Sequence, residues 1–224
     1  MKRKRVERLS FFGDPNVGLF AKASDKLCLV GKAVLKSDRD IIEDVLKVPV
    51  IDITISNTNL IGIFAAMNSK GIILPKIVTE GELKEIAKLD LNFGVIEDTI
   101  YTALGNLILC NDKGAIVSPL LEKFIDIIED VLEVKCEIST VANLNIVGSC
   151  GKANNKGCLL HRDATEDELK VIEKTLGVEV DIGTVNFGSP FVASGIITNS
   201  NGIIIGGETT GPEVARVVEA LGFL

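Results

Sequence analysis

Several residue types are missing or scarce in this chain of 224 residues, and their scarcity narrows the chemistry it can perform. The sequence has no tryptophan and no glutamine, and its one histidine is His161. No apolar run approaches the roughly 18 residues that a membrane-spanning helix needs. The basic start, Met1 to Arg5, is not followed by the apolar segment of a secretory signal. These absences predict a cytoplasmic protein with no membrane partner.

The cysteines do not form a pattern that binds a metal or builds a disulfide framework. There are five, an odd number, and none lies in a C-x-x-C pair. With a single histidine, the spacing typical of a zinc site is also missing. We interpret the cysteines as small apolar residues of a reduced protein, and we expect neither a metal nor a cofactor. They are Cys28, Cys110, Cys136, Cys150 and Cys158.

The chain is acidic, with a formal net charge of −7 at pH 7. Nucleic acid phosphates repel such a protein unless positive charge is concentrated somewhere on its surface. The one strong basic cluster is Lys2 to Arg5, which either reaches phosphates or is a solvated, frayed end. The charge therefore argues against wrapping of naked DNA or RNA. A protein partner, or a mixed protein–RNA surface, stays open.

Turn sequences recur along the chain at a nearly constant spacing. Their last glycines are residues 71, 114, 157 and 202, which lie 43, 43 and 45 residues apart, and Ala23–Lys26 is a degenerate fifth copy. Asn, Asp and Gly tolerate the left-handed backbone of a tight turn. Short apolar runs flank the turns, for example Gly62–Ala66 and Ile72–Leu74. We predict a β-hairpin around each copy, with clear turns at 68–71, 111–114, 154–157 and 199–202.

A helix is predicted after each hairpin, and each begins at a serine or threonine. In three of them a glutamate follows three residues later, which is the pattern of a capping box. Apolar residues then recur at helical spacing, so one stripe of each helix is expected to face a sheet. The predicted starts are Ser37, Thr79, Ser118, Thr165 and Thr210, and the glutamates are Glu82, Glu168 and Glu213.

A third strand is predicted after each helix except the last, at 50–54, 93–97, 134–140 and 178–185. Val6–Phe11 precedes the first hairpin without a helix of its own, so we predict that it completes the last unit and closes a ring. Small residues such as Ser10 and Thr54 suggest that the third strands pack around the axis, with the helices outside. The expected fold is an α/β propeller with five-fold pseudo-symmetry, in which residues 1–224 form one domain of five ββαβ repeats.

Short segments in several repeats carry a resemblance to a known family. They are Phe20-Ala21-Lys22 with Cys28-Leu29-Val30, Ala103-Leu104-Gly105-Asn106 with Cys110-Asn111-Asp112, Val147-Gly148-Ser149, and Gly183-Thr184-Val185-Asn186 with Gly188-Ser189. A ring of five ββαβ units is the pentein architecture. Within it, the chain resembles the archaeal translation initiation factor 6 family over nearly its whole length.

The resemblance implies a binding function without catalysis. Members of this family bind the large ribosomal subunit near the sarcin–ricin loop and block its premature association with the small subunit. A role in large-subunit biogenesis is also implied. The expected partners are therefore a ribosomal protein and local ribosomal RNA, with no DNA. We expect a monomer whose rigid ring loses little entropy on docking.

Asparagine recurs beside glycine where one repeat passes to the next, and these junctions are predicted to lie at one end of the ring. One interpretation is a rim of amide groups that docks on a ribosomal protein. The other is turn chemistry, because such bends require Asn and Gly. The resemblance favours contact most strongly at Gly105-Asn106. The candidate ribosome-binding residues are Asn16, Asn59, Leu104, Gly105, Asn106, Asn145 and Asn186.

The alternative function is that of a guanidine-modifying enzyme, because other penteins catalyse such reactions. Those enzymes use a late cysteine, a histidine and paired carboxylates at the ring centre. Here no cysteine follows Cys158, so the fifth repeat has no nucleophile of this kind. We therefore expect no catalytic residue, and we interpret His161 as a structural or surface residue.

Overall fold

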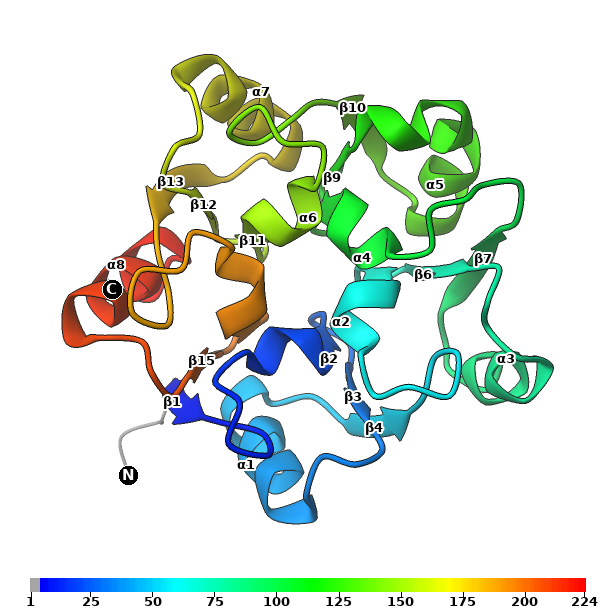
Figure 1. The fold of residues 1–224 in the computed structure, drawn as a ribbon, viewed down its shortest axis with the longest axis horizontal. Helices are drawn as coiled ribbons and strands as arrows, with labels where there is room; N and C mark the ends of the chain where they lie inside the picture. The colour runs from blue at the N-terminus through cyan, green and yellow to red at the C-terminus, as the bar shows by residue number, and fades with distance from the viewer. Residues whose placement is uncertain (1–4) are drawn as a thin grey trace.

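The computed structural model describes residues 5–224, which form five similar units arranged around a central axis (Figure 1). Each unit contains one three-stranded sheet, in which the first and second strands are antiparallel and the second and third are parallel. A short helix precedes the first strand, and a longer helix follows the second strand. The predicted five-fold pseudo-symmetric fold is confirmed.

The strands are short, as expected for sheets that each belong to one repeat. The first strands are β2 (Ala21–Ala23), β5 (Ala66–Met67), β8 (Ile108–Cys110), β11 (Gly151–Ala153) and β14 (Ile196–Thr198). The second strands are β3 (Cys28–Gly31), β6 (Gly71–Pro75), β9 (Gly114–Val117), β12 (Gly157–His161) and β15 (Ile203–Gly206). The third strands are β4 (Val50–Ile53), β7 (Asn92–Ile96), β10 (Lys135–Ile138), β13 (Glu179–Gly183) and β1 (Val6–Leu9).

Two sets of helices differ in length and position. The longer ones lie on the outside of the ring and are α1 (Lys36–Leu46), α3 (Glu80–Ile86), α5 (Ile125–Leu132), α7 (Glu166–Leu176) and α8 (Gly211–Ala220) (Figure 1). A 3-10 helix, η2 (Pro119–Phe124), precedes α5. The short inner helices are η1 (Val17–Leu19), α2 (Ile61–Phe64), α4 (Leu104–Leu107), α6 (Val147–Cys150) and η3 (Val192–Gly195). None of the helices in residues 5–224 is long and apolar enough to cross a membrane.

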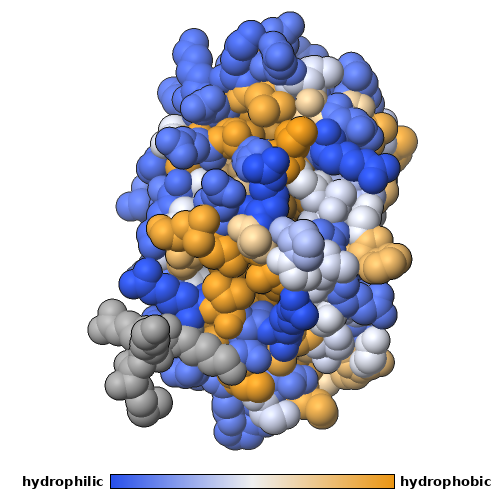
Figure 2. Space-filling view, turned by 90° about the vertical axis from the view of Figure 1, so that its left-hand side faces the viewer, coloured by the Kyte–Doolittle hydropathy of each residue, from blue (hydrophilic) through white to orange (hydrophobic). Residues whose placement is uncertain are grey.

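The N-terminal strand closes the ring, as the sequence predicts. β1 pairs in parallel with β15, with Val6 opposite Ile203 and Leu9 opposite Gly206. This pairing gives the fifth unit the third strand that the other units obtain from the segment after their own helix. Figure 2 views the side of the ring where β1 and α8 lie, and hydrophobic side chains are visible there among hydrophilic ones.

The radial order of the strands differs from the prediction. The first strands, not the third, lie nearest the axis, and those of neighbouring units contact one another, as β2 does with β5 and β14. The third strands lie at the outer edge of each sheet, and β10 is only half-buried, with Lys135 and Glu137 exposed. Their small residues therefore do not reflect crowding at the axis.

The run Gly62–Ala66, which we predicted as a hairpin strand, is mostly the helix α2, and the strand β5 begins only at Ala66. The reason is close packing between neighbouring inner helices. A Cβ on Gly62 would lie 1.9 Å from the carbonyl oxygen of Gly18, so this contact requires glycine. Such an inter-repeat constraint outweighs the β propensity of the isoleucines.

The predicted helix starts hold for three of five helices. Thr79, Thr165 and Thr210 are N-cap residues, and the glutamate three residues after each accepts hydrogen bonds from that residue's backbone N–H and hydroxyl. The start at Ser37 is wrong, because α1 begins at Lys36 with Leu35 as its N-cap. Ser118 caps the 3-10 helix η2 rather than an α-helix.

Each outer helix packs against its own sheet and against the sheet of the preceding unit. For example, α5 contacts both β10 and β6, and α7 contacts both β13 and β9. The apolar stripe of α5 is buried as predicted, with Ile128 and Leu132 fully inaccessible. Because adjacent units share side chains in one core cluster, neither buries its apolar surface alone.

Four asparagines at the hairpin turns join one unit to the next, and we call them the asparagine belt. The amide nitrogen of Asn111, for example, donates to the carbonyl oxygens of Asn154 (3.1 Å) and Leu176 (2.9 Å) in the next unit. Leu176 is the last residue of α7, where carbonyl groups lack partners within the helix. The belt comprises Asn68, Asn111, Asn154 and Asn199.

In the first unit a serine takes the place of the belt asparagine. Ser24 accepts hydrogen bonds from the backbone of its own turn, but its hydroxyl does not reach the second unit. Lys26 contacts that unit instead, through the carbonyl oxygen and the carboxylate of Asp90. The contact made by this hairpin turn is therefore an exposed ion pair, a weaker connection than a buried amide.

Asn111→Ala is expected to lower the free energy of unfolding by about 3 kcal/mol, because it leaves buried carbonyl and N–H groups without partners. The N–H groups that lose their acceptor are those of Lys113 and Gly114. The matched control is Asn92→Ala, since Asn92 is exposed and bonds one carboxylate, that of Glu133. Urea denaturation measures both. If Asn111→Ala lowers the free energy of unfolding no more than Asn92→Ala does, the asparagine belt does not stabilise the ring.

Candidate functional site

A funnel opens on the axis between the five inner helices. The cavity has a volume of about 260 Å³, and residues from all five units line it. The inner helices approach one another closely because each has a small residue at the contact. A Cβ on Gly105 would lie 2.2 Å from the carbonyl oxygen of Gly62, and one on Gly148 would lie 2.2 Å from that of Gly105. These glycines set the width of the funnel.

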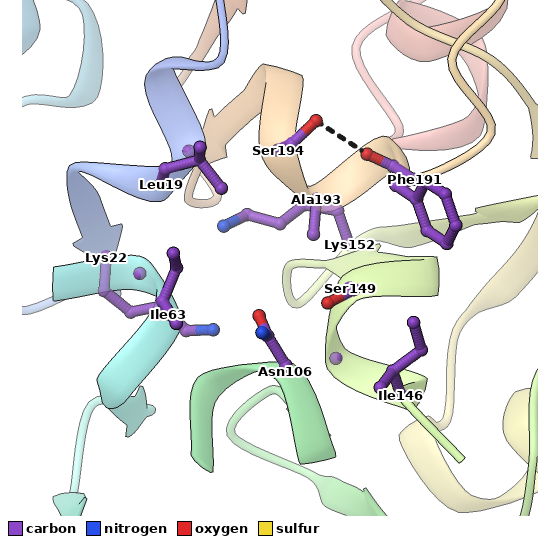
Figure 3. Close-up of a pocket in the computed structure, with 13 residues that line it drawn as sticks. Leu19, Lys22, Ile63, Asn106, Ile146, Ser149, Lys152, Phe191, Ala193 and Ser194 are labelled. Carbon is purple, nitrogen blue, oxygen red and sulfur yellow. Dashed lines mark hydrogen bonds between the residues drawn. The ribbon is translucent and has the colours of Figure 1, made fainter. Parts of the chain in front are cut away.

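The residues that follow the contacts between inner helices are apolar in two units and polar in three. The residue after each contact point projects from its inner helix, and all five line the cavity. Leu19 and Ile63 come from the first and second units, whereas the later units contribute Asn106, Ser149 and Ser194 (Figure 3). The ring is symmetric in its backbone, but the surface of its funnel is not.

Two lysines lie at the base of the funnel. Figure 3 shows Lys22 from β2 and Lys152 from β11 extending toward the axis. Burial, and then the charge of Lys22, lower the pKa of Lys152 to about 7. Burial also lowers the pKa of Lys22. Sequence reasoning missed both residues, because a single lysine in a short apolar strand carries no motif.

Tight turns surround the mouth of the funnel, each following a third strand. In three of them a helix of the next unit holds the turn, because its capping glutamate accepts two backbone N–H groups. Glu82 accepts from Ser56 and Asn57, at 2.9 and 2.8 Å. Glu168 and Glu213 bind the turns at 142–143 and 187–188 in the same way. The turn residues Ser56, Asn57, Ala142, Asn143, Asn186 and Phe187 all have positive φ.

The same three glutamates have low pKa values. Burial raises the pKa of Glu82, but hydrogen bonds from Thr79, from Asn57 and from Thr54 outweigh burial and lower it to about 2. The pKa of Glu213 is likewise about 2, and that of Glu168 is lowered. The folded state thus favours the ionised carboxylates.

The predicted site residues fall into three groups. The side chains of Asn106, on the funnel wall, and Asn145, exposed before α6, make no hydrogen bond within residues 5–224. Asn16, Asn59 and Asn186 are engaged internally, as the turn interpretation expects. The amide of Asn186 donates to the oxygens of Pro15 (3.0 Å) and Asn16 (3.3 Å).

Asn59 accepts from the backbone N–H of Ala33 at 2.9 Å. Leu104 and Gly105 are buried, so neither residue is available to a partner. We assign these two residues the role of positioning Asn106, which follows them in α4.

Exposed aromatic residues at the turns were also missed by sequence reasoning. Phe12 and Phe187 are 60% and 83% exposed, on turns that flank the fifth unit. Phe191 lines the funnel and is 39% exposed, with its ring edge-on to buried His161 at 5.7 Å. Phe12 and Phe187 themselves have positive φ, a backbone conformation that is costly for phenylalanine.

The cysteines and the histidine are poorly placed for nucleophilic catalysis. Burial raises the pKa of Cys28 to about 12 and that of Cys150 to about 11, which disfavours the reactive thiolate. His161 is buried, and its Nδ1 accepts the backbone N–H of Asp163 at 3.1 Å. Within the described part of the chain, no three Cys, His, Asp or Glu side chains gather as metal ligands would.

Comparison with known proteins identifies the family. The family model of the eIF-6 family matches residues 6–220. The chain belongs to the eIF-6 family. Translation initiation factor 6 of Pyrococcus horikoshii is 39% identical over 225 residues, covering 98% of this chain and 99% of the relative. That of Methanocaldococcus jannaschii is 40% identical over 226 residues, with the same coverage of each.

These matches confirm the family resemblance that we inferred from the sequence. Among solved structures, a crystal structure of a dimethylarginine dimethylaminohydrolase variant matches with a TM-score of 0.49 and 10% identity. The match covers 79% of this chain and 69% of that chain. At this level of similarity it carries no functional argument.

Glu82→Gln is expected to lower the free energy of unfolding by about 2 kcal/mol at pH 7, because an amide replaces a carboxylate that accepts several hydrogen bonds. The folded pKa of about 2 lies below the ordinary value of 4.5, so the stabilisation is full above pH 4.5. It disappears as pH falls toward 2. Urea denaturation at pH 7 and pH 2.5 tests this. Glu80→Gln, an exposed change in the same helix turn, should have little effect at either pH.

Gly105→Ala is expected to lower the free energy of unfolding by about 1–3 kcal/mol, because the new methyl group overlaps the Gly62 carbonyl. Gly81→Ala is the matched control. Gly81 is exposed in helix α3, where a Cβ meets no atom closer than 4.0 Å, so alanine should stabilise by up to about 1 kcal/mol. Equal melting temperatures for the two variants would show that the inner helices tolerate a wider separation.

Proposed function

We propose that this chain is a translation factor that binds the large ribosomal subunit and prevents its premature association with the small subunit. The observation that carries the proposal is membership of the eIF-6 family over residues 6–220. The relatives are named translation initiation factor 6 and align over almost their whole length. The factor acts as a monomer and without catalysis, by occupying a surface that the small subunit needs.

The docking surface in this proposal is the face that carries the inner helices and the turns around the funnel. It combines unpaired amides at Asn106 and Asn145 with exposed rings at Phe12 and Phe187. Amphipathic and aromatic groups of this kind are common at the centres of protein–protein interfaces. The partner on this face is a ribosomal protein, with local ribosomal RNA near the sarcin–ricin loop at its edge.

Rigidity supports this mode of action. The ring is closed by β1, its units share core clusters, and three of the turns are held by the carboxylates of capping glutamates. A surface that is already ordered loses little conformational entropy when it docks, so a modest contact area gives useful affinity. A steric block also requires that the bound protein not deform when the small subunit approaches.

The catalytic alternative, a guanidine-modifying pentein, has less support. The thiols have raised pKa values, and the groups at the base of the funnel are lysines rather than carboxylates. A cationic base repels a guanidinium substrate, whereas carboxylates would attract it. Turnover assays with arginine and agmatine on the purified chain would reveal this activity if it exists.

Co-sedimentation with separated archaeal ribosomal subunits tests the proposal. The chain is expected to migrate with the large subunit alone and to reduce the yield of joined ribosomes. Asn106→Ala should weaken large-subunit binding by about tenfold, the equivalent of one lost interfacial contact, while its melting temperature stays unchanged. Asn92→Ala, on the outer edge of a sheet, is the control and should bind normally.

Migration of the chain with neither subunit would overturn the proposed function. If Asn106→Ala binds the large subunit normally, the proposed function still holds, but Asn106 is not part of the interface. A parallel fall in melting temperature and affinity would assign Asn106 a structural role instead.

A further inference from the structure

The two lysines of the funnel occupy equivalent positions in repeats whose other members are apolar. Each is the central residue of a three-residue first strand and pairs with a leucine, Lys22 with Leu29 and Lys152 with Leu159. The same position in the second, third and fifth units holds Ala66, Leu109 and Ile197. The fold therefore accepts an apolar residue here, and the lysines are not required by the architecture.

Within residues 5–224, neither ammonium group has a hydrogen-bond or ion-pair partner. Lys152 is only 7% exposed. A buried, unpaired charge costs free energy, and a second charge nearby raises the cost, as the pKa of Lys152, lowered by burial and then by the charge of Lys22, indicates. We expect a protein to keep such an unfavourable buried charge where the charged group binds a ligand.

Among the residues that the structure describes, no carboxylate influences the two ammonium groups from the elements packed around them. The ionisable groups that influence them are the thiols of Cys28 and Cys110, whose pKa values burial raises, so both are neutral. Asp25 and Asp112 lie at the hairpin end of the first strands, where serine and asparagine side chains occupy their oxygens. The base of the funnel is thus cationic and open toward its mouth.

We propose that the funnel binds a small amphiphilic oxyanion, with its anionic head between Lys22 and Lys152 and its apolar body along the wall. Leu19, Ile63 and Phe191 supply the apolar surface, and the amide of Asn106 points into the same space to donate to the head (Figure 3). A volume of about 260 Å³ admits one ring or a short chain beside the head group. The head is a phosphate or carboxylate, since both accept hydrogen bonds from ammonium groups.

Calorimetric titration of the purified full chain tests this inference without ribosomes, so its outcome is separate from that of the proposed function. The probes are phenyl phosphate, benzoate, inorganic phosphate and benzyl alcohol. Phenyl phosphate or benzoate, whichever head the site prefers, should bind at least about tenfold more tightly than inorganic phosphate, because only the aromatic anions fill the apolar wall. Benzyl alcohol, which lacks the anionic head, should show no measurable binding.

Lys152→Met and Lys22→Met should each weaken binding of the aromatic anion by at least about tenfold. Both variants are expected to fold, since the equivalent positions of other units are apolar. Lys88→Met removes the same charge from the exposed surface and should bind as the parent does. Binding should also weaken from pH 7 to pH 9, as Lys152 loses its proton.

Two results would overturn the inference. One is binding of the aromatic anions to both methionine variants with the affinity of the parent, which would place them elsewhere on the surface. The other is an affinity for benzyl alcohol equal to that for the aromatic anions, which would reduce the site to an apolar cavity.

Discussion

The ring depends on the way each unit satisfies the unpaired carbonyl groups of its neighbour. A helix leaves its last carbonyls without partners, and here a buried amide from the preceding hairpin turn supplies the missing donors, as Asn111 does for Leu176. At the other end of three helices, a capping glutamate extends beyond its own helix to a turn of the preceding unit. Both ends of a helix thus act as joints between units, and the joints position the funnel and the turns around it.

Much of the fold was predictable because its signals are local. The turns at 68–71 and 111–114, the capping boxes and the apolar stripe of α5 follow from residues close together in the sequence. Features set by contacts between repeats were not predictable in the same way. The sequence does not reveal which strand lies nearest the axis, nor that Gly62 belongs to a helix whose geometry Gly18 limits.

The candidate site shows the same division. Turn chemistry predicts that the asparagines gather at one end of the ring. It does not separate Asn186, whose amide makes hydrogen bonds within the protein, from Asn106, whose side chain lines the funnel. Lys22 and Lys152 become conspicuous only when the repeats are superposed and their equivalents prove to be apolar. The departures from five-fold symmetry, more than the symmetric features, mark where function is expected.

The pairing of β1 with β15 has a consequence for synthesis on the ribosome. Val6 leaves the exit tunnel early, whereas its partner Ile203 is made almost 200 residues later, so the strand must wait for the rest of the chain. Until then β1 has no strand to pair with. Such long-range closure is slow and comes late in folding. A nascent chain of this protein therefore cannot present the completed ring before its own translation is almost finished.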